Sequence, residues 1–153
     1  MASPDRSIPT VFYNMCMVCD GDNVLVENRV DPKLHGYVFP GGHVENGESF
    51  SASVVREIFE ETGLKIENPS LCGLVHWLGP DRKWVGYLYR ADKFCGNLCS
   101  SDEGEVFWMP LGEFVKSPNL APDMSAFLEV FLKDEYSELF YEEFDNNADF
   151  HLL

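Results

Sequence analysis

The stretch that decides the fold is residues 41–64, which read GGHVENGESFSASVVREIFEETGL. Apolar residues recur at helical spacing in its second half, which predicts a helix from about Ser49 to Thr62. Gly63 follows at once, where a glycine with a left-handed backbone commonly ends a helix. The apolar side of this helix is expected to hold Val54, Val55, Ile58 and Phe59. We therefore expect the helix to bury that side and to present the other.

The opposite side of the predicted helix carries three carboxylates. At about 100° per residue, Glu57, Glu60 and Glu61 fall within an arc of about 100°. Neighbouring like charges repel and destabilise a helix unless a cation or a basic side chain offsets them. Clustered carboxylates suit Mg²⁺ or Mn²⁺, although a solvated acidic face is the alternative. Arg56 lies beside the cluster and can orient carboxylates through bidentate hydrogen bonds.

A glycine-rich loop before the helix favours the metal site over the solvated face. In Pro40-Gly41-Gly42, a ligand can approach backbone carbonyls and amides because no Cβ stands in the way. Glu48 then adds a fourth carboxylate close to the start of the helix. Four carboxylates, an arginine and a glycine loop together predict a site for a metal ion and phosphate groups.

The rest of the chain alternates strands and helices. Strands are expected at residues 10–19, 24–29, 37–39, 71–78, 84–91 and 105–109. A short helix is expected at 110–115, a second long helix at 123–133 and an edge strand at 136–144. This order predicts an α/β sandwich with a mixed β-sheet between helices. Since the chain has 153 residues, a single domain spanning 1–153 is expected.

Charge and composition narrow the kinds of partner. The net charge is −15, from 11 Lys and Arg against 26 Asp and Glu. Nucleic-acid backbones and anionic lipid surfaces repel such a chain, which disfavours nucleic acid and membrane as general partners. The sequence has no apolar run long enough to span a bilayer, and its first six residues do not resemble a signal peptide. An odd number of cysteines, five, is typical of reduced thiols, so a cytoplasmic location is expected.

Zinc binding by the cysteines is disfavoured. Cys16 and Cys19 lie in a predicted strand, where a three-residue spacing points their side chains to opposite faces. Cysteine is also among the side chains most often buried without any ligand. We therefore expect both thiols to pack as small apolar groups.

The spacing within residues 42–64 resembles a known family signature. The pattern G-x5-E-x7-R-E-U-x-E-E-x-G-U, with U an apolar residue, is the Nudix box, and this chain matches it at every defined position. The matching residues are Gly42, Glu48, Arg56, Glu57, Ile58, Glu60, Glu61, Gly63 and Leu64. Residues 96–108, 118–127 and the aromatic tail resemble the MutT-type branch, the 8-oxo-dGTP diphosphatases. The resemblance implies the α/β/α sandwich of the Nudix family.

The same resemblance implies metal-binding and catalytic roles. The implied ligands of a divalent cation, Mg²⁺ or alternatively Mn²⁺, are Glu57, Glu60, Glu61, Glu103 and the carbonyl of Gly41. Arg56 would hold Glu57 and Glu48 in place from outside the metal shell. The base that takes a proton from water would be Glu57 or Glu103, although Glu105 could take the place of Glu103.

The resemblance also implies which residues contact the substrate, and for some of them a structural role is the alternative. Arg29 matches a basic phosphate contact of the family, and the backbone of Gly42 is expected to touch the substrate. Tyr37 and Phe39 could flank a base, but both also suit a buried strand. Asp123 lies where related enzymes read a purine edge, and it could equally be the N-cap of the following helix.

The implied reaction is hydrolysis of a nucleoside triphosphate to a monophosphate and pyrophosphate, as in MutT-like sanitation of the nucleotide pool. An oxidised purine nucleotide is the first candidate substrate. ADP-ribose or another nucleoside diphosphate derivative is the alternative. A silent, nucleotide-sensing domain is a third hypothesis, disfavoured because Glu57, Glu60 and Glu61 are all present. A monomer and a homodimer are equally compatible with the sequence.

Overall fold

The computed structural model describes residues 4–142 and 149–153, and every structural statement below refers to that part of the chain. Its strands are β1 (Thr10–Asp20), β2 (Asn23–Arg29), β3 (Gly36–Val38), β4 (Leu64–Glu67), β5 (Ser70–Leu78), β6 (Lys83–Ala91), β7 (Lys93–Gly96), β8 (Gly104–Pro110), β9 (Glu138–Tyr141) and β10 (Phe150–Leu152). Its helices are α1 (Phe50–Thr62), α2 (Leu111–Phe114) and α3 (Met124–Leu132).

A large mixed sheet organises the molecule. Its strands follow the order β10-β9-β5-β6-β1-β2-β3, and β8 pairs with β2. The β1–β6 and β5–β9 pairs are parallel, whereas β2 pairs antiparallel with β1, β3 and β8. β4 and β7 form a separate two-stranded sheet. The expected α/β fold with a mixed sheet is therefore confirmed.

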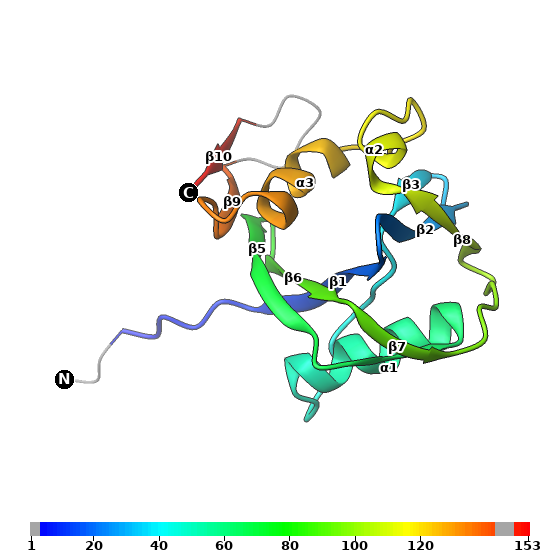
Figure 1. The fold of residues 1–153 in the computed structure, drawn as a ribbon. Helices are drawn as coiled ribbons and strands as arrows, with labels where there is room; N and C mark the ends of the chain where they lie inside the picture. Colours follow the sequence, from blue (N-terminus) through cyan, green and yellow to red (C-terminus); the bar gives the residue numbers. More distant parts are fainter. Residues whose placement is uncertain (1–3, 143–148) are drawn as a thin grey trace.

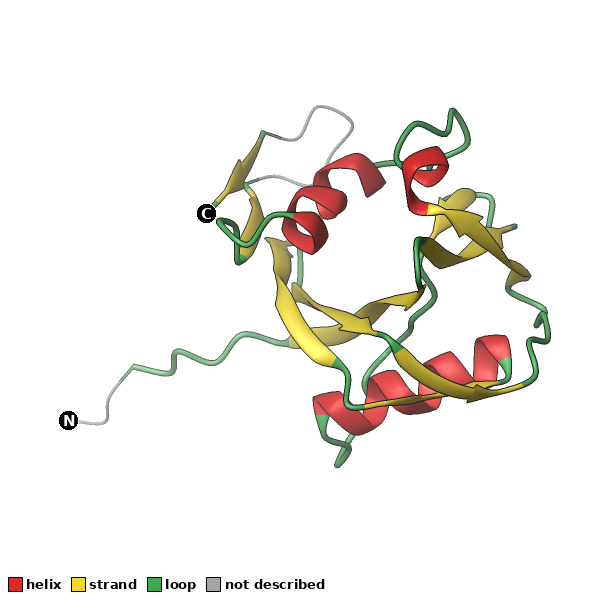
Figure 2. Cartoon of the chain, viewed as in Figure 1, coloured by secondary structure: helices red, strands yellow, loops and turns green. Residues whose placement is uncertain are grey.

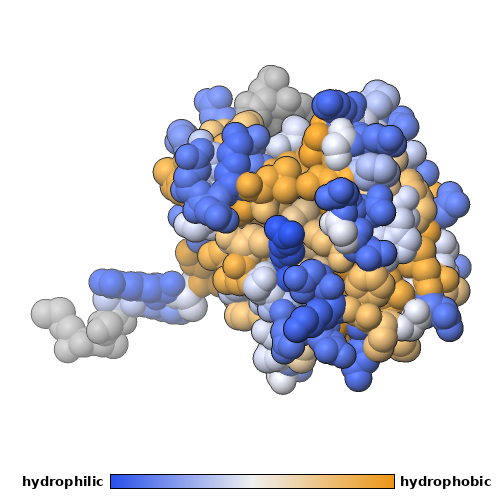
Figure 3. All heavy atoms as spheres, in the orientation of Figure 1, coloured by the Kyte–Doolittle hydropathy of each residue, from blue (hydrophilic) through white to orange (hydrophobic). Residues whose placement is uncertain are grey.

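The helices cover opposite sides of this sheet, with α1 on one side and α2 and α3 on the other (Figures 1 and 2). Two hydrophobic cores result, and alternation along β2 assigns its side chains to both. Val24 and Val26 belong to the core that includes α3, whereas Leu25 belongs to the core that includes Val54 and Ile58 of α1. On the face shown in Figure 3, hydrophobic residues lie between groups of hydrophilic ones. Within the described ranges, no helix combines the length and the apolar character that crossing a membrane requires.

Helix α1 begins and ends as its sequence predicts. The Ser49 hydroxyl accepts a hydrogen bond from the Ala52 amide at 3.1 Å. Gly63 adopts φ 73° and donates its amide to the Phe59 carbonyl at 2.9 Å, which is the left-handed glycine cap.

The predicted buried side of α1 is partly wrong. Val54 and Ile58 are buried, but Phe59 is 57% exposed. The helix is turned so that Glu61 and Thr62 face inward instead. The rotation has a chemical consequence, because it places a carboxylate of the box inside the protein.

Most other elements lie where the sequence predicts them, with three additions. Strands β4, β7 and β10 were not expected, and each is four residues long or shorter. The strand predicted at 136–144 corresponds to β9 (Glu138–Tyr141), and residues 143 and 144 lie outside the described part of the chain. Its predicted edge position is wrong, because β9 pairs with β5 on one side and with β10 on the other. Cys16 and Cys19 are both buried and belong to different cores, as their spacing predicts.

We expect Gly41→Ala to destabilise the protein by about 1–3 kcal/mol, the usual cost of overpacking. A Cβ at Gly41 would lie 2.2 Å from the Asn14 carbonyl oxygen and 2.7 Å from the Cα of Met15, both part of the β1 backbone. Gly112→Ala is the control, since a Cβ there meets nothing within 4 Å. Urea unfolding measures both variants. Equal stability of the two would contradict the close approach of the loop to β1.

Candidate active site

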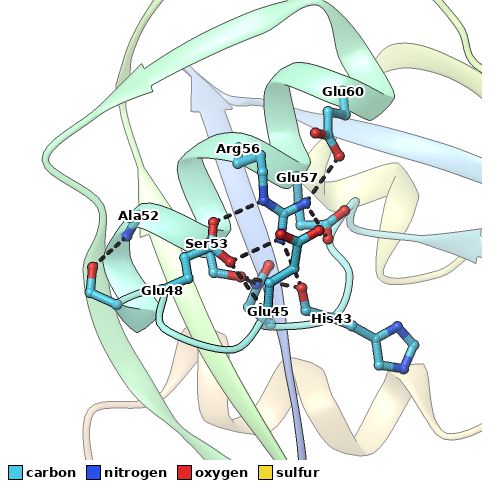
Figure 4. Close-up of polar contacts among 10 residues, drawn as sticks. His43, Glu45, Glu48, Ala52, Ser53, Arg56, Glu57 and Glu60 are labelled. Atoms are coloured by element: carbon cyan, nitrogen blue, oxygen red, sulfur yellow. Dashed lines mark hydrogen bonds and ion pairs between the residues drawn. The ribbon is translucent and has the colours of Figure 1, made fainter.

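Arg56 of α1 ties the preceding loop to the helix (Figure 4). Its Nε and Nη2 donate to the two carboxylate oxygens of Glu48 at 2.8 and 3.0 Å. Its Nη1 donates to Glu57 at 2.8 Å and to Glu60 at 3.0 Å, and Nη2 also donates to the His43 carbonyl at 3.0 Å. These hydrogen bonds lower the pKa of Glu48 to about 2. The guanidinium therefore keeps Glu48 ionised and holds three carboxylates in fixed positions.

The glycine pair lies directly against two carboxylates of α1. A Cβ at Gly42 would lie 2.3 Å from Glu57 Oε2, so a larger residue there would displace that carboxylate. The Gly41 amide donates to Glu61 Oε2 at 2.9 Å. The loop glycines thus let the backbone approach the helix closely, and one of them binds a carboxylate directly.

A second group of carboxylates comes from three separate elements. Glu27 of β2, Glu61 of α1 and Glu103, just before β8, each offer one oxygen within 4.8 Å of the others. Glu27 is fully buried and Glu61 is 4% exposed. Burial raises the pKa of Glu27 to about 7, and burial together with the charge of Glu27 raises that of Glu61. The ionised forms of these side chains are therefore destabilised unless a cation joins them.

Strand pairing positions the basic partner of this group. Arg29 lies opposite Gly104 in the β2–β8 pair, and Val30 donates its amide to the Glu103 carbonyl at 3.2 Å. The Arg29 guanidinium binds Glu103 Oε2 at 2.9 Å. Its Nε is buried and has no acceptor among the described residues. Arg29 thus offsets one carboxylate, and its partly exposed guanidinium can donate to a further anion.

The unpaired oxygens indicate that the site suits a divalent cation. Both oxygens of Glu27 and Oε1 of Glu61 are buried without a hydrogen-bond donor in the described part of the chain. Mg²⁺ and Mn²⁺ usually bind hard oxygen ligands such as these three carboxylate oxygens. Two carboxylates of the Nudix box differ in solvent exposure: the side chain of Glu57 is 13% exposed, whereas that of Glu60 is 56% exposed.

A pocket of about 670 Å³ opens beside these carboxylates. Its lining includes Arg29, Gly41, Gly42, Glu57 and Glu103, which the sequence predicts as site residues. The pocket therefore brings together the glycine loop, the start of β8 and the end of β2. Glu60 and Tyr37 are not among the described residues that line it.

Aromatic side chains form another part of the pocket wall. The β5–β6 register places Trp77 opposite Trp84, with ring centroids 5.9 Å apart and planes 10° apart. Tyr13 packs on Trp77 at 5.9 Å, and the His43 ring meets Trp84 at 6.4 Å. His43 thereby connects the aromatic wall to the glycine loop. Flat apolar surfaces of this kind bind heteroaromatic rings by stacking.

Asp123 supplies a carboxylate to the same pocket. It occupies the N-cap position of α3, as the alternative interpretation expects, but it adopts φ 65° and its side chain makes no capping hydrogen bond. The hydroxyl of buried Tyr141 lies near enough to this carboxylate to affect its ionisation. Burial raises the pKa of Asp123, and Tyr141 opposes that rise. Strained backbone at a pocket residue is common at functional sites.

The two aromatic residues predicted to flank a base have structural contacts. Phe39 is 1% exposed, stacks on Phe114 at 4.7 Å and meets Phe131 edge-on at 5.1 Å. Tyr37 meets Phe107 edge-on at 5.4 Å. Phe39 also lines the pocket. Both side chains thus belong to the core, as the alternative interpretation had it.

The sequence interpretation missed three residues of the site. Glu27 follows Val24-Leu25-Val26, and a carboxylate at the end of an apolar run is a detectable signal. Trp77 and Trp84 flank a predicted turn, and the sequence interpretation gave them no role in the site. Their places on either side of the turn at 79–82 could have indicated that they face each other across two strands.

Comparison with known proteins decides the family. The model of the NUDIX domain matches residues 13–131, most of the chain. The chain belongs to the Nudix family. Nudix hydrolases generally use a divalent metal, which agrees with the acidic cluster of Glu27, Glu61 and Glu103.

Individual Nudix proteins show how far the likeness extends. The uncharacterized Nudix hydrolase YvcI of Bacillus subtilis is 32% identical over 144 residues, which cover 90% of this chain and 88% of that protein. The NAD-capped RNA hydrolase NudC of Actinobacillus succinogenes is 34% identical over 124 residues, 77% of this chain. That match covers only 46% of NudC, so this chain spans about half the length of that relative.

Solved structures give the same fold. The mutator MutT protein of Bacillus halodurans superposes with a TM-score of 0.74 and 27% identity, covering 93% of this chain and 97% of that one. A bifunctional NMN adenylyltransferase/ADP ribose pyrophosphatase of Francisella tularensis superposes with a TM-score of 0.64. At 18% identity and with 42% of that chain covered, the second likeness concerns the fold alone.

We expect Arg56→Lys to lower the free energy of unfolding by about 1–3 kcal/mol, because an ammonium group cannot replace the forked hydrogen bonds of a partly buried guanidinium. Arg82→Lys is the matched control, since the exposed Arg82 guanidinium pairs with its exposed neighbour Asp81. It should change stability by less than about 0.5 kcal/mol. Urea unfolding at neutral pH compares the two, and equal losses would contradict the linking role of Arg56.

Proposed function

We propose that this Nudix enzyme is a Mg²⁺-dependent pyrophosphohydrolase that converts a nucleoside triphosphate to a monophosphate and pyrophosphate. One observation carries the proposal: Arg29, Glu57 and Glu103 line the same pocket as Trp77 and Trp84. A nucleotide needs this combination, because it joins a flat aromatic base to a polyanionic phosphate chain. The cytoplasmic location, the single domain and the oligomeric state stay predictions.

The phosphate chain would lie along Arg29 and the glycine loop. Arg29 lines the pocket and is partly exposed, so its guanidinium can donate to a phosphate oxygen beside its bond to Glu103. The glycines at 41 and 42 allow phosphate groups to come close to the backbone. The chemistry that Mg²⁺ supplies when bound is neutralisation of phosphate charge and acidification of the attacking water.

Glu57 is the proposed base for that water, with Glu103 as the alternative. Burial raises the pKa of Glu57, while the hydrogen bond from Arg56 opposes the rise. A carboxylate with a raised pKa accepts a proton more readily than an exposed one. Arg56 also holds the carboxylate by one oxygen, Oε1, and Glu57 lines the pocket.

The nucleobase of the substrate would bind beside Trp77 and Trp84, with the Asp123 carboxylate at its edge. A carboxylate accepts two hydrogen bonds from adjacent N–H groups, which guanine and its 8-oxo form both present. This arrangement supports an oxidised purine nucleotide as the first candidate substrate. The likeness to a mutator MutT protein supports the same choice.

Hydrolysis of another nucleoside diphosphate derivative, such as ADP-ribose or an NAD derivative, is the second candidate. The observation that favours it is the 34% identity to an NAD-capped RNA hydrolase. The net charge of −15 disfavours an RNA chain as part of the substrate. A silent, nucleotide-sensing domain is disfavoured, since Glu57, Glu60 and Glu61 are all present.

With Mg²⁺ present, we expect turnover of a purine triphosphate panel to release pyrophosphate, and Glu57→Gln to lower kcat at least about a hundredfold. The amide keeps the shape but cannot accept the proton from water. Pyrophosphate and phosphate release are measured separately, with AMP release followed for ADP-ribose and NAD. Glu67→Gln, an exposed change on β4, is the control. Preference for ADP-ribose over every triphosphate would overturn the first candidate.

We expect Asp123→Asn to shift the preference from guanine-type towards adenine-type triphosphates by at least about tenfold in kcat/KM. An amide can donate one hydrogen bond and accept another, which matches the adenine edge rather than two N–H donors. Asp92→Asn, also an exposed acid-to-amide change, should leave the ratio unaltered. An unchanged ratio in Asp123→Asn would remove this residue from base recognition.

A further inference from the structure

Glu27 occupies a position where strand β2 should carry an apolar side chain. Its side chain points to the same face as Leu25, two residues earlier, and that face packs against α1. Glu27 is fully buried there. Neither of its carboxylate oxygens has a hydrogen-bond donor among the described residues. A buried carboxylate without a partner is costly, so this position needs a physical explanation.

The surroundings of Glu27 add more negative charge than positive charge. Glu61 lies beside it with one unpaired buried oxygen, and Glu103 completes the group within 4.8 Å. Arg29 is the basic residue of this neighbourhood, and its guanidinium binds Glu103. The Gly41 amide satisfies the other oxygen of Glu61. Glu27 therefore faces an acidic neighbour, and the charge of Arg29, whose guanidinium binds Glu103, offsets that of Glu27 only in part.

The backbone around Glu27 is shaped to bring these carboxylates together. Gly104 pairs with Arg29 across the β2–β8 ladder, and a Cβ at Gly104 would lie 3.2 Å from Glu27 Cγ and 2.3 Å from the Asn28 carbonyl oxygen. A larger residue would therefore push Glu103 and the start of β8 away from β2. The close approach of the two strands keeps Glu103 beside Glu27.

We propose that Glu27 is a direct ligand of the divalent cation, contributed by β2 beside Glu61 of α1 and Glu103. The proposal deepens the proposed function and rests on its metal site, but it concerns a residue outside the box. Because Glu27 sits in the middle of a paired strand, it offers a more rigid ligand than a loop carboxylate can. A cation at Glu27 and Glu61 also accounts for all three unpaired oxygens of the cluster.

The rival explanation is that Glu27 is a neutral acid that hydrogen-bonds to Glu61 and never touches the cation. Glu27→Gln separates the two explanations, because an amide mimics the neutral acid in shape and in donor capacity. Glu27→Asp adds a second distinction. It keeps the negative charge but withdraws the carboxylate by one methylene, which disturbs direct ligation more than attraction at a distance.

The experiment is a titration with Mn²⁺ alone, without nucleotide, by calorimetry or electron spin resonance. We expect Glu27→Gln to weaken Mn²⁺ binding at least tenfold and Glu27→Asp at least threefold. Glu61→Gln is the positive control, also expected to lose at least tenfold. Glu67→Gln, an exposed change on β4, should stay within twofold of the unaltered protein. Thermal unfolding without metal establishes that each variant is folded.

The outcomes separate this inference from the proposed function. If Glu61→Gln loses affinity while Glu27→Gln and Glu27→Asp keep it, Glu27 is not a ligand and only the inference fails. If all three variants keep the affinity, the acidic cluster holds no cation and the proposed metal-dependent hydrolysis fails with it. Should Glu27→Gln not fold, Glu27→Asp alone decides, and unaltered affinity in that variant overturns the proposal.

Discussion

The structure depends on the burial of like charges between α1 and the sheet. Glu27 and Glu61 are almost completely buried from solvent between α1 and the sheet, and Glu103 lies beside them. Such a group destabilises the metal-free fold, since carboxylates lose hydration and repel one another. The fold accepts this cost at the place where a divalent cation would convert repulsion into attraction. The same oxygens thus weaken the empty protein and define its chemistry.

The remaining polar groups of the site hold that arrangement in place. Arg56 gathers Glu48, Glu57 and the His43 carbonyl on the outer side of α1, so the glycine loop cannot move away from the helix. On the inner side, the Gly41 amide binds Glu61. Helix α1 is therefore fixed to the loop from two directions. Its carboxylates are consequently oriented by the protein before any ligand binds, which is how preorganised sites lower the cost of binding.

The aromatic wall depends on a different constraint, the pairing of strands. Trp77 and Trp84 are seven residues apart, and the antiparallel register of β5 and β6 stacks them. The His43 ring then joins Trp84 to the loop that carries the glycines. Tyr141 approaches from β9, close to the end of the chain, and its hydroxyl lies near Asp123. The pocket is thus assembled from the loop, one hairpin, α3 and the last strands, and no single segment contains it.

Local sequence determined the features that depend on neighbours along the chain. The approximate bounds of α1, its glycine cap at Gly63 and the burial of Cys16 and Cys19 in different cores follow from periodicity and spacing, because these are properties of a few consecutive residues. Only the tertiary structure decided that α1 turns Glu61 inward and leaves Phe59 exposed, since that rotation is set by packing on the sheet. It also decided that Glu27 joins Glu61 and Glu103, and that Asp123 lies near Tyr141 and makes no capping hydrogen bond. These contacts join residues far apart in the chain, and their positions come from strand register and helix packing, which no local pattern records.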